Sequence, residues 1–362
     1  MKPPFSWDSY SDQPHVLRDR ALRRQITRSR WADQLLTALE SLIILPAAAV
    51  AAPWLSPRSP RPLTRDFYAL CVNEDKGEAQ YALVEELGVR QLQLRIPLWE
   101  MERLEEYLKF ARGFGPERSW LITVMQDREH VLDRELSVRH LSEIFDAFSP
   151  LDAEFMIGNA VNRTKWGFFS MGEYLEWYQA IERYAREKHP GLILVGPGVI
   201  DFEYHYLVRA LFHRRPLRFD RIGALLYVDR RGSPRSRQMG YFDLSRKIDL
   251  LYALARLGPA AATDRIYVTE TNWPLSGTAP WAPTGEKECV DEASYTRYMQ
   301  EYYQIAAASG KVERVYWHQL IAPGYGLVDH REGALRKREA FYRFKEMIRN
   351  TPDPHTPQEK KL

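Results

Sequence analysis

The chain has little cysteine, no metal-binding motif and no excess of charge of one sign. Its 362 residues include two cysteines, Cys71 and Cys289, which are too few for a disulfide framework. No CxxC, HExxH or clustered Cys/His run occurs, so no dedicated zinc site is predicted. The 51 basic and 48 acidic side chains nearly balance, which argues against nucleic-acid binding. What the chain does have is 45% apolar residues, enough for a large core.

The first 65 residues differ from the rest. Residues 18–30 are rich in arginine, and residues 42–55 form an apolar run interrupted by Pro46 and Pro53. A proline-rich linker follows at 56–65. Three interpretations stay open: an arm packed on the rest of the protein, a contact with a membrane or protein partner, and a cleaved leader. The predicted location is cytoplasmic or peripheral to the inner membrane, with export left open.

The possible membrane or partner contact would use residues 18–55. The apolar run is shorter than the roughly 20 residues that span a bilayer. A leader fits poorly, because the basic residues lie well inside the chain and Glu40 abuts the apolar run.

From residue 67 onward, short apolar runs alternate with segments of helical periodicity. The eight runs are 67–72, 91–96, 120–125, 154–157, 192–195, 222–227, 265–269 and 314–318. This alternation predicts a single (β/α)8 TIM barrel over residues 66–350, with a helical or extended arm at 1–65 and a disordered tail at 351–362. The last helix is predicted over 336–348. An open doubly wound sheet is the alternative, but no glycine-rich phosphate loop follows the first run.

In a (β/α)8 barrel the active site lies at the carboxyl ends of the strands. Carboxylates, amides and tryptophans gather there, a set that suits a sugar site, although any barrel rim is polar. The candidates are Arg95, Asp127, Asn159, Asn162, Asp201, Glu203, Tyr227, Asp229, Glu270, Asn272, Trp273, Trp317 and His318.

Three segments resemble the clan of retaining glycoside hydrolases built on this barrel. They are IYVTETNW at 266–273, MIGNAVN at 156–162 and VYWH at 315–318. The resemblance implies a carbohydrate ligand and no metal or organic cofactor. It implies Glu270 as nucleophile and a set of sugar-binding residues around it. In this set, Tyr227 bonds Glu270, Arg95 keeps it ionised, Asn159 contacts a sugar hydroxyl, Trp273 and Trp317 stack on the sugar, and Asn162, Trp166 and His318 complete the subsite.

Position 160 departs from the resemblance, because alanine stands where the clan has its acid/base glutamate. Three explanations stay open. A carboxyl group from another loop replaces the acid, with Asp127, Asp201, Glu203 and Asp229 as candidates. Alternatively, the protein is a sugar-binding pseudoenzyme. Finally, Ala160 is an engineered change or the alignment is displaced.

Four arginines within residues 229–237 could hold an anionic sugar, although a charge run is usually a solvated face. The sequence therefore predicts a glycoside hydrolase-like protein that acts on or binds a polysaccharide or glycoconjugate, such as an acidic cell-envelope polysaccharide or lipopolysaccharide. A scaffold in an envelope-polymer assembly complex, attached through the arm, is the alternative from a different class.

Overall fold

Eight parallel strands close into a barrel in the computed structural model, which describes residues 6–59, 61–228 and 232–354. The barrel closes because β10 pairs with both β3 and β9. In chain order the strands are β3 (Tyr68–Val72), β4 (Gln91–Pro97), β5 (Ser119–Met125), β6 (Ala153–Ile157), β7 (Leu194–Ile200), β8 (Arg221–Leu225), β9 (Ile266–Thr271) and β10 (Val312–Trp317). The predicted (β/α)8 barrel is confirmed.

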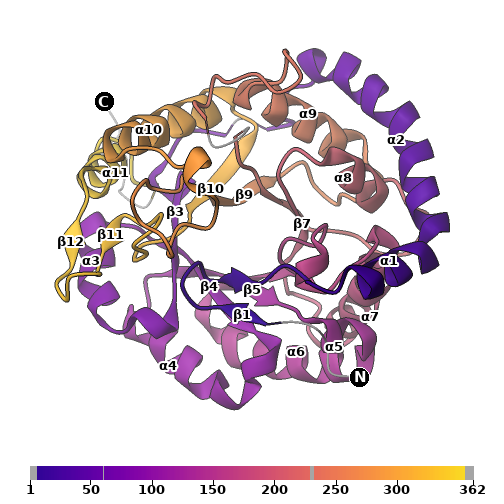
Figure 1. Ribbon diagram of the computed structural model, residues 1–362, viewed down its shortest axis with the longest axis horizontal. Coiled ribbons are helices and arrows are strands. Elements are labelled where there is room, and N and C mark those ends of the chain that lie inside the picture. Colours follow the sequence, from indigo (N-terminus) through magenta and orange to yellow (C-terminus); the bar gives the residue numbers. More distant parts are fainter. Residues whose placement is uncertain (1–5, 60, 229–231, 355–362) are drawn as a thin grey trace, which may run out of the picture.

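Helices surround the strands in a ring (Figure 1). They are α3 (Ala79–Leu87), α4 (Leu104–Gly113), α5 (Arg128–Leu132), α6 (Arg134–Phe148), α7 (Met171–Lys188), α8 (Tyr204–Leu211), α9 (Leu244–Leu257), α10 (Glu292–Ser309) and α11 (Glu339–Arg349). Local sequence sets their ends. The Asp291 side chain accepts a hydrogen bond from the backbone N–H of Ser294 at the start of α10, and Gly310 ends that helix in the left-handed conformation.

The core has two layers, which decide where a side chain at a strand end can point. Alternate residues of a strand face opposite sides, so Tyr316 packs inside the barrel while Trp317 packs between the strands and the helices. Met156 and Tyr267 belong to the inner layer, and Val268 to the outer one. Only inner-facing positions can reach a site at the centre of the barrel.

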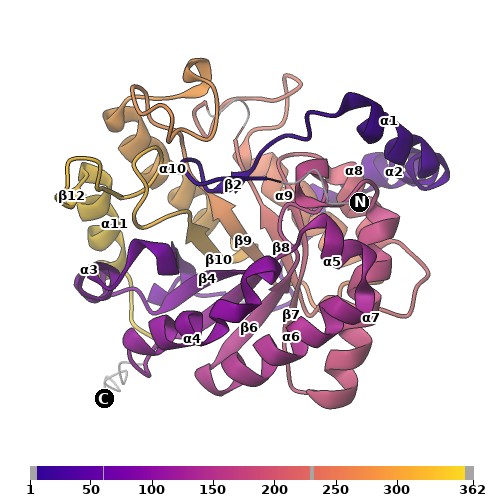
Figure 2. The ribbon, with the colours of Figure 1, turned by 60° about the horizontal axis from the view of Figure 1, so that its bottom comes forward.

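The N-terminal arm folds against the barrel in two ways. Strands β1 (Trp7–Asp8) and β2 (Gln13–Pro14) form a hairpin at the carboxyl end of the barrel (Figure 2). Helices α1 (Arg20–Ser29) and α2 (Trp31–Ala51) then follow the outside, where α2 packs against α8 and α9. The helix α2 runs through Pro46, so proline does not interrupt the apolar segment as the sequence suggested.

Two predicted boundaries are wrong. Residues 336 and 337 form the short strand β12 (Arg336–Lys337), which pairs with β11 (Val328–Asp329), so the last helix begins later than predicted. The chain after α11 also contacts the barrel, because the Pro352 carbonyl accepts a hydrogen bond from the Arg65 N–H and Asp353 pairs with Arg65. Of the predicted disordered tail, residues 355–362 lie outside the described residues.

Candidate active site

A cavity of about 210 Å³ lies at the carboxyl end of the barrel, between the strand ends and the N-terminal hairpin. Residues 11–13 of the hairpin cover it. The barrel contributes the side chains of Arg95, Asn159, Ala160, Arg163, Lys165, Trp166, Ile200, Asp201, Leu225, Tyr227, Glu270, Asn272, Pro283, Thr284, His318 and Tyr325. The structure therefore brings together most of the predicted site residues and leaves Asn162, Trp273 and Trp317 outside the cavity.

Glu270 reaches the cavity because β9 carries an extra residue near its end. Strand β10 pairs Val315 with Val268 but Trp317 with Thr271, so three steps along β9 match two along β10. A bulge of this kind turns the following side chains to the other face. Glu270 is half-buried, and its Oε1 accepts a hydrogen bond from the Tyr227 hydroxyl. The predicted contact between these two residues is present.

Arg95 contacts a carboxylate that the sequence did not indicate. Its Nη2 forms an ion pair with Asp12 of the hairpin, not with Glu270. The Asp12 carboxylate also accepts hydrogen bonds from Asn73 Nδ2, at 2.9 Å, and from Gln319 Nε2. Burial alone would raise the pKa of Asp12, but the Arg95 guanidinium and the Gln319 amide outweigh it and leave the pKa below its usual range.

No local pattern in the sequence identifies Asp12, because its hairpin is distant in sequence from the barrel residues that it contacts. Its left-handed backbone, with φ of 54°, directs the tip of the hairpin toward the barrel. Asp12 is thus a cavity residue that sequence reasoning missed.

His318 follows β10 and is 5% exposed at the cavity wall. Its ring stacks on Tyr325, with centroids 5.6 Å apart. Burial lowers the pKa of His318 to about 4, against the opposing effect of Glu270, so the ring is neutral near pH 7. Within the described part of the chain, its buried Nδ1 has no hydrogen-bond partner.

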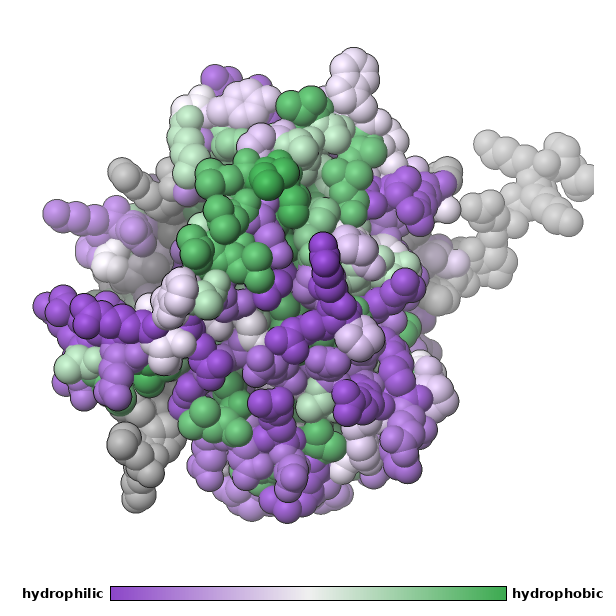
Figure 3. Space-filling view, turned by 90° about the vertical axis from the view of Figure 1, so that its right-hand side faces the viewer, coloured by the Kyte–Doolittle hydropathy of each residue, from purple (hydrophilic) through white to green (hydrophobic). Residues whose placement is uncertain are grey.

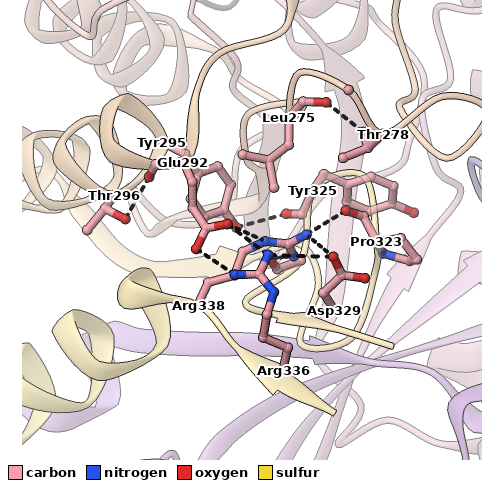
Figure 4. Close-up of polar contacts among 12 residues, drawn as sticks. Leu275, Thr278, Glu292, Tyr295, Thr296, Pro323, Tyr325, Asp329, Arg336 and Arg338 are labelled. Carbon is pink, nitrogen blue, oxygen red and sulfur yellow. Dashed lines mark hydrogen bonds and ion pairs between the residues drawn. The ribbon is translucent and has the colours of Figure 1, made fainter. Parts of the chain in front are cut away.

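The loop that carries His318 and Tyr325 is held by a buried arginine. Arg338, 1% exposed, donates a hydrogen bond to the carbonyl of Pro323 at 2.7 Å (Figure 4). It also donates to the Gly326 carbonyl at 2.9 Å. It also pairs with Asp329 at 3.0 Å. The guanidinium supplies hydrogen-bond donors to loop carbonyls that have no helix or sheet partner. These bonds fix the loop, which forms one wall of the cavity.

Ala160 lines the cavity beside Asn159. Of the predicted replacement acids, Asp201 alone is both described and at the cavity, and its Oδ2 accepts a hydrogen bond from Arg163 at 2.6 Å.

Asp127 instead caps α5 and bonds His130. Glu203 lies outside the cavity wall and pairs with Arg163 at 2.6 Å. Asp229 lies outside the described residues.

Three predicted sugar contacts are corrected by the structure. Asn162 uses its amide to join loops, donating to the Ile200 carbonyl and to Glu203 and accepting from the Ile200 N–H. Trp273 and Trp317 are fully buried in the outer layer, where their rings lie 6.0 Å apart. Because they face the helices, neither ring can stack on a sugar in the cavity.

Trp166 does line the cavity, but the arm shares its surface. The Trp7 ring packs edge-on against it, with centroids 6.0 Å apart. Lys165 beside it donates a hydrogen bond to Gln13. The predicted aromatic platform is therefore partly covered by the hairpin.

The arginine loop after β8 shows no anion cradle in its described part. Arg235 pairs with Glu301 of α10, and residues 229–231 lie outside the described chain. The loop after β9 does reach the cavity, through Pro283 and Thr284, while Trp281 packs against Tyr10 of the hairpin.

No family model matches the chain, and no curated protein matches it. Solved structures do. A GH39 enzyme from Xanthomonas axonopodis pv. citri matches with a TM-score of 0.58 and 14% identity, over 83% of this chain and 71% of that one. A GH39 β-xylosidase from Caulobacter crescentus matches with a TM-score of 0.57 and 12% identity, over 81% and 74%. A GH5 cellulase from an Icelandic hot spring isolate matches with a TM-score of 0.52 and 13% identity, over 83% and 91%.

The chain has the fold of these glycoside hydrolases. At identities of 12–14% the likeness concerns the fold alone, so the chemistry of the cavity has to be argued from its own residues.

Proposed function

We propose that this glycoside hydrolase-like protein binds a terminal sugar of a polysaccharide or glycoconjugate in the cavity, with Glu270 facing the anomeric carbon. The observation that carries the proposal is the Glu270–Tyr227 pair at the wall of a cavity that also contains Asn159 and His318. The volume of about 210 Å³ is smaller than the roughly 300–1,000 Å³ of most ligand sites, which favours one sugar unit over an extended chain.

The residues around Glu270 favour binding over efficient hydrolysis of natural linkages. A retaining mechanism needs a second carboxyl group about 5–5.5 Å from the nucleophile, which protonates the leaving oxygen. Ala160 supplies none, and Asp12 is held by Arg95, Asn73 and Gln319. Loss of general acid catalysis typically costs a factor of about 10²–10⁴. Glycosides with good leaving groups need little protonation and are the substrates that Glu270 would still attack.

Asp201 supports a second candidate, a hydrolase that uses this carboxyl group as its acid. It is the predicted replacement acid that lines the cavity. On this alternative, natural linkages are cleaved, and Asp201→Asn abolishes that cleavage while activated glycosides are spared.

The test uses a panel of nitrophenyl glycosides, the corresponding disaccharides as substrates with natural linkages, and calorimetric binding of the matching free sugars. Because the similar structures include a xylosidase and a cellulase, the panel contains xylosides and glucosides, and a glucuronide tests the acidic-sugar prediction. The wild type is compared with Glu270→Gln, Ala160→Glu and Asp201→Asn. We expect slow nitrophenol release that Glu270→Gln abolishes, and cleavage of natural linkages only in Ala160→Glu.

Each outcome has a distinct meaning. Sugar binding without any release, weakened by Glu270→Gln, identifies a binding protein. Cleavage of natural linkages by the wild type that Asp201→Asn removes identifies the hydrolase. Absence of both binding and release across the panel overturns the carbohydrate proposal.

A further inference from the structure

Helix α2 leaves most of its large apolar side chains exposed, while Ile44 and Leu45 pack against the barrel. The residues that it buries are Thr37, Ser41 and Ala48. The exposed ones include Leu42, at 73%, and Ile43, at 74%. The exposed apolar set of the helix and its C-terminal end is Trp31, Leu35, Leu36, Leu39, Leu42, Ile43, Val50 and Trp54. A surface helix normally buries such a stripe, and an apolar patch left exposed marks an interaction site.

Polar contacts hold the other face of α2 on the barrel. The Asp33 carboxylate accepts hydrogen bonds from Arg209 Nε, at 3.0 Å, and from the Gly172 N–H, at 2.8 Å. The Ser41 hydroxyl donates to the Thr37 carbonyl of the same helix at 2.6 Å and lies 3.4 Å from the His205 carbonyl of α8. The helix is therefore fixed along α8 and α9 with its apolar stripe facing outward.

The segment Trp31–Trp54 has a mean hydropathy of 2.0 over its most apolar window and is long enough to cross a membrane. Crossing would break the contacts of Asp33 with the barrel and would place Asp33 and Glu40 in or near the hydrocarbon, at a high cost. The arrangement instead suits a helix that lies in the plane of the membrane surface.

Unpaired positive charge lies next to the apolar stripe. Helix α1 contains no acidic residue and joins α2 at Arg30. Five exposed arginines precede the junction: Arg18, Arg20, Arg23, Arg24 and Arg28. Within the described chain, none of these five forms an ion pair. Figure 3, which faces this side of the molecule, shows the apolar patch with hydrophilic side chains directly beside it.

We propose that α1 and α2 form a docking surface for an anionic phospholipid bilayer. The exposed stripe of α2 inserts into the interface, and the arginines of α1 contact the phosphate groups. Charge complementarity favours this occupant over an uncharged apolar partner, because the stripe adjoins a cluster of arginines that form no ion pair within the described chain. The proposal is independent of the chemistry at Glu270.

Sedimentation of the full chain with vesicles tests the proposal. We expect binding to vesicles of phosphatidylcholine with phosphatidylglycerol, weaker binding to phosphatidylcholine alone, and loss at high salt. Arg20→Gln/Arg24→Gln lowers the affinity by about tenfold or more, since each arginine near an anionic surface contributes a factor of about five. Leu42→Gln/Ile43→Gln lowers the affinity on both kinds of vesicle.

The matched control is Leu132→Gln/Met239→Gln, which replaces side chains that are 64% and 81% exposed elsewhere on the surface and leaves vesicle binding unchanged. All positions changed are exposed, and thermal melting verifies that each variant folds. The proposal is overturned if the wild type binds neither vesicle at low salt. Self-association of the chain without vesicle binding would instead make the stripe an interface between copies. Retention in the membrane after carbonate extraction would show a spanning helix and would equally contradict it.

Discussion

Burial makes His318 neutral in the folded protein, and this has a consequence for stability. Its pKa is about 4 when folded and about 6.5 when unfolded, so the unfolded chain binds more protons between these values. The contribution of His318 to the free energy of unfolding is present in full above about pH 6.5. It falls by about 3 kcal/mol in all as the pH is lowered toward 4. We predict that His318→Asn flattens this part of the stability profile, measured by urea unfolding at several pH values.

A second histidine titrates over the same range. Burial lowers the pKa of His213 to about 4 as well, so the variant retains some pH dependence. The control is His15→Asn, which changes an exposed histidine that does not line the cavity. If the free energy of unfolding depended on pH to the same extent in the wild type and in His318→Asn, the assignment of a neutral, buried imidazole to the cavity wall would be contradicted.

Residues at the strand ends also show what the sequence could and could not reveal. Strand alternation shows that Tyr316 and Trp317 cannot both face inward, and only the structure shows that Tyr316 is the inner one. The inward position of Glu270 depends on the bulge opposite Val315 and Trp317, and a bulge leaves no local sequence signal. The resemblance placed Glu270 correctly at the cavity, while periodicity alone would have turned it outward.

The hairpin formed by β1 and β2 limits the size of the cavity. Trp7 packs on Trp99 and Trp166, and Gln13 bonds Lys165 and the Pro283 carbonyl. An extended saccharide chain would have to displace these contacts. We therefore predict that Trp7→Ala raises the affinity for an oligosaccharide relative to its monosaccharide by about fivefold to tenfold, the effect of 1–1.4 kcal/mol, measured by calorimetry.

Trp31→Ala is the matched control, because Trp31 is 65% exposed on α2 and does not line the cavity. An unchanged ratio of the two affinities in Trp7→Ala would show that the hairpin does not restrict the site. This element was not predictable from the sequence, since β1 and β2 are two residues long and their hairpin contacts partners more than 60 residues away.

At the scale of the whole molecule, the regular part of the fold was predictable and the arm was not. Apolar runs and helical periodicity are local, so they identified the strands, and their number identified the closed barrel. The path of residues 6–55 depends on long-range contacts such as Asp12–Arg95 and Asp33–Arg209. These contacts make the arm an integral part of both the cavity and the outer surface.

The contact between Asp33 and Arg209 joins the arm to the barrel, and it provides the last prediction. Arg209 is 8% exposed, and removing the carboxylate leaves it with Glu40 at 3.8 Å and leaves the Gly172 N–H without its acceptor. We predict that Asp33→Ala lowers the free energy of unfolding by about 2 kcal/mol, the usual cost of buried charged and polar groups that lose a partner. Urea denaturation measures this change. Asp146→Ala, which removes an exposed pair with His189, should cost less than about 1 kcal/mol. Equal, small effects of the two substitutions would mean that the arm detaches from the barrel without loss of stability.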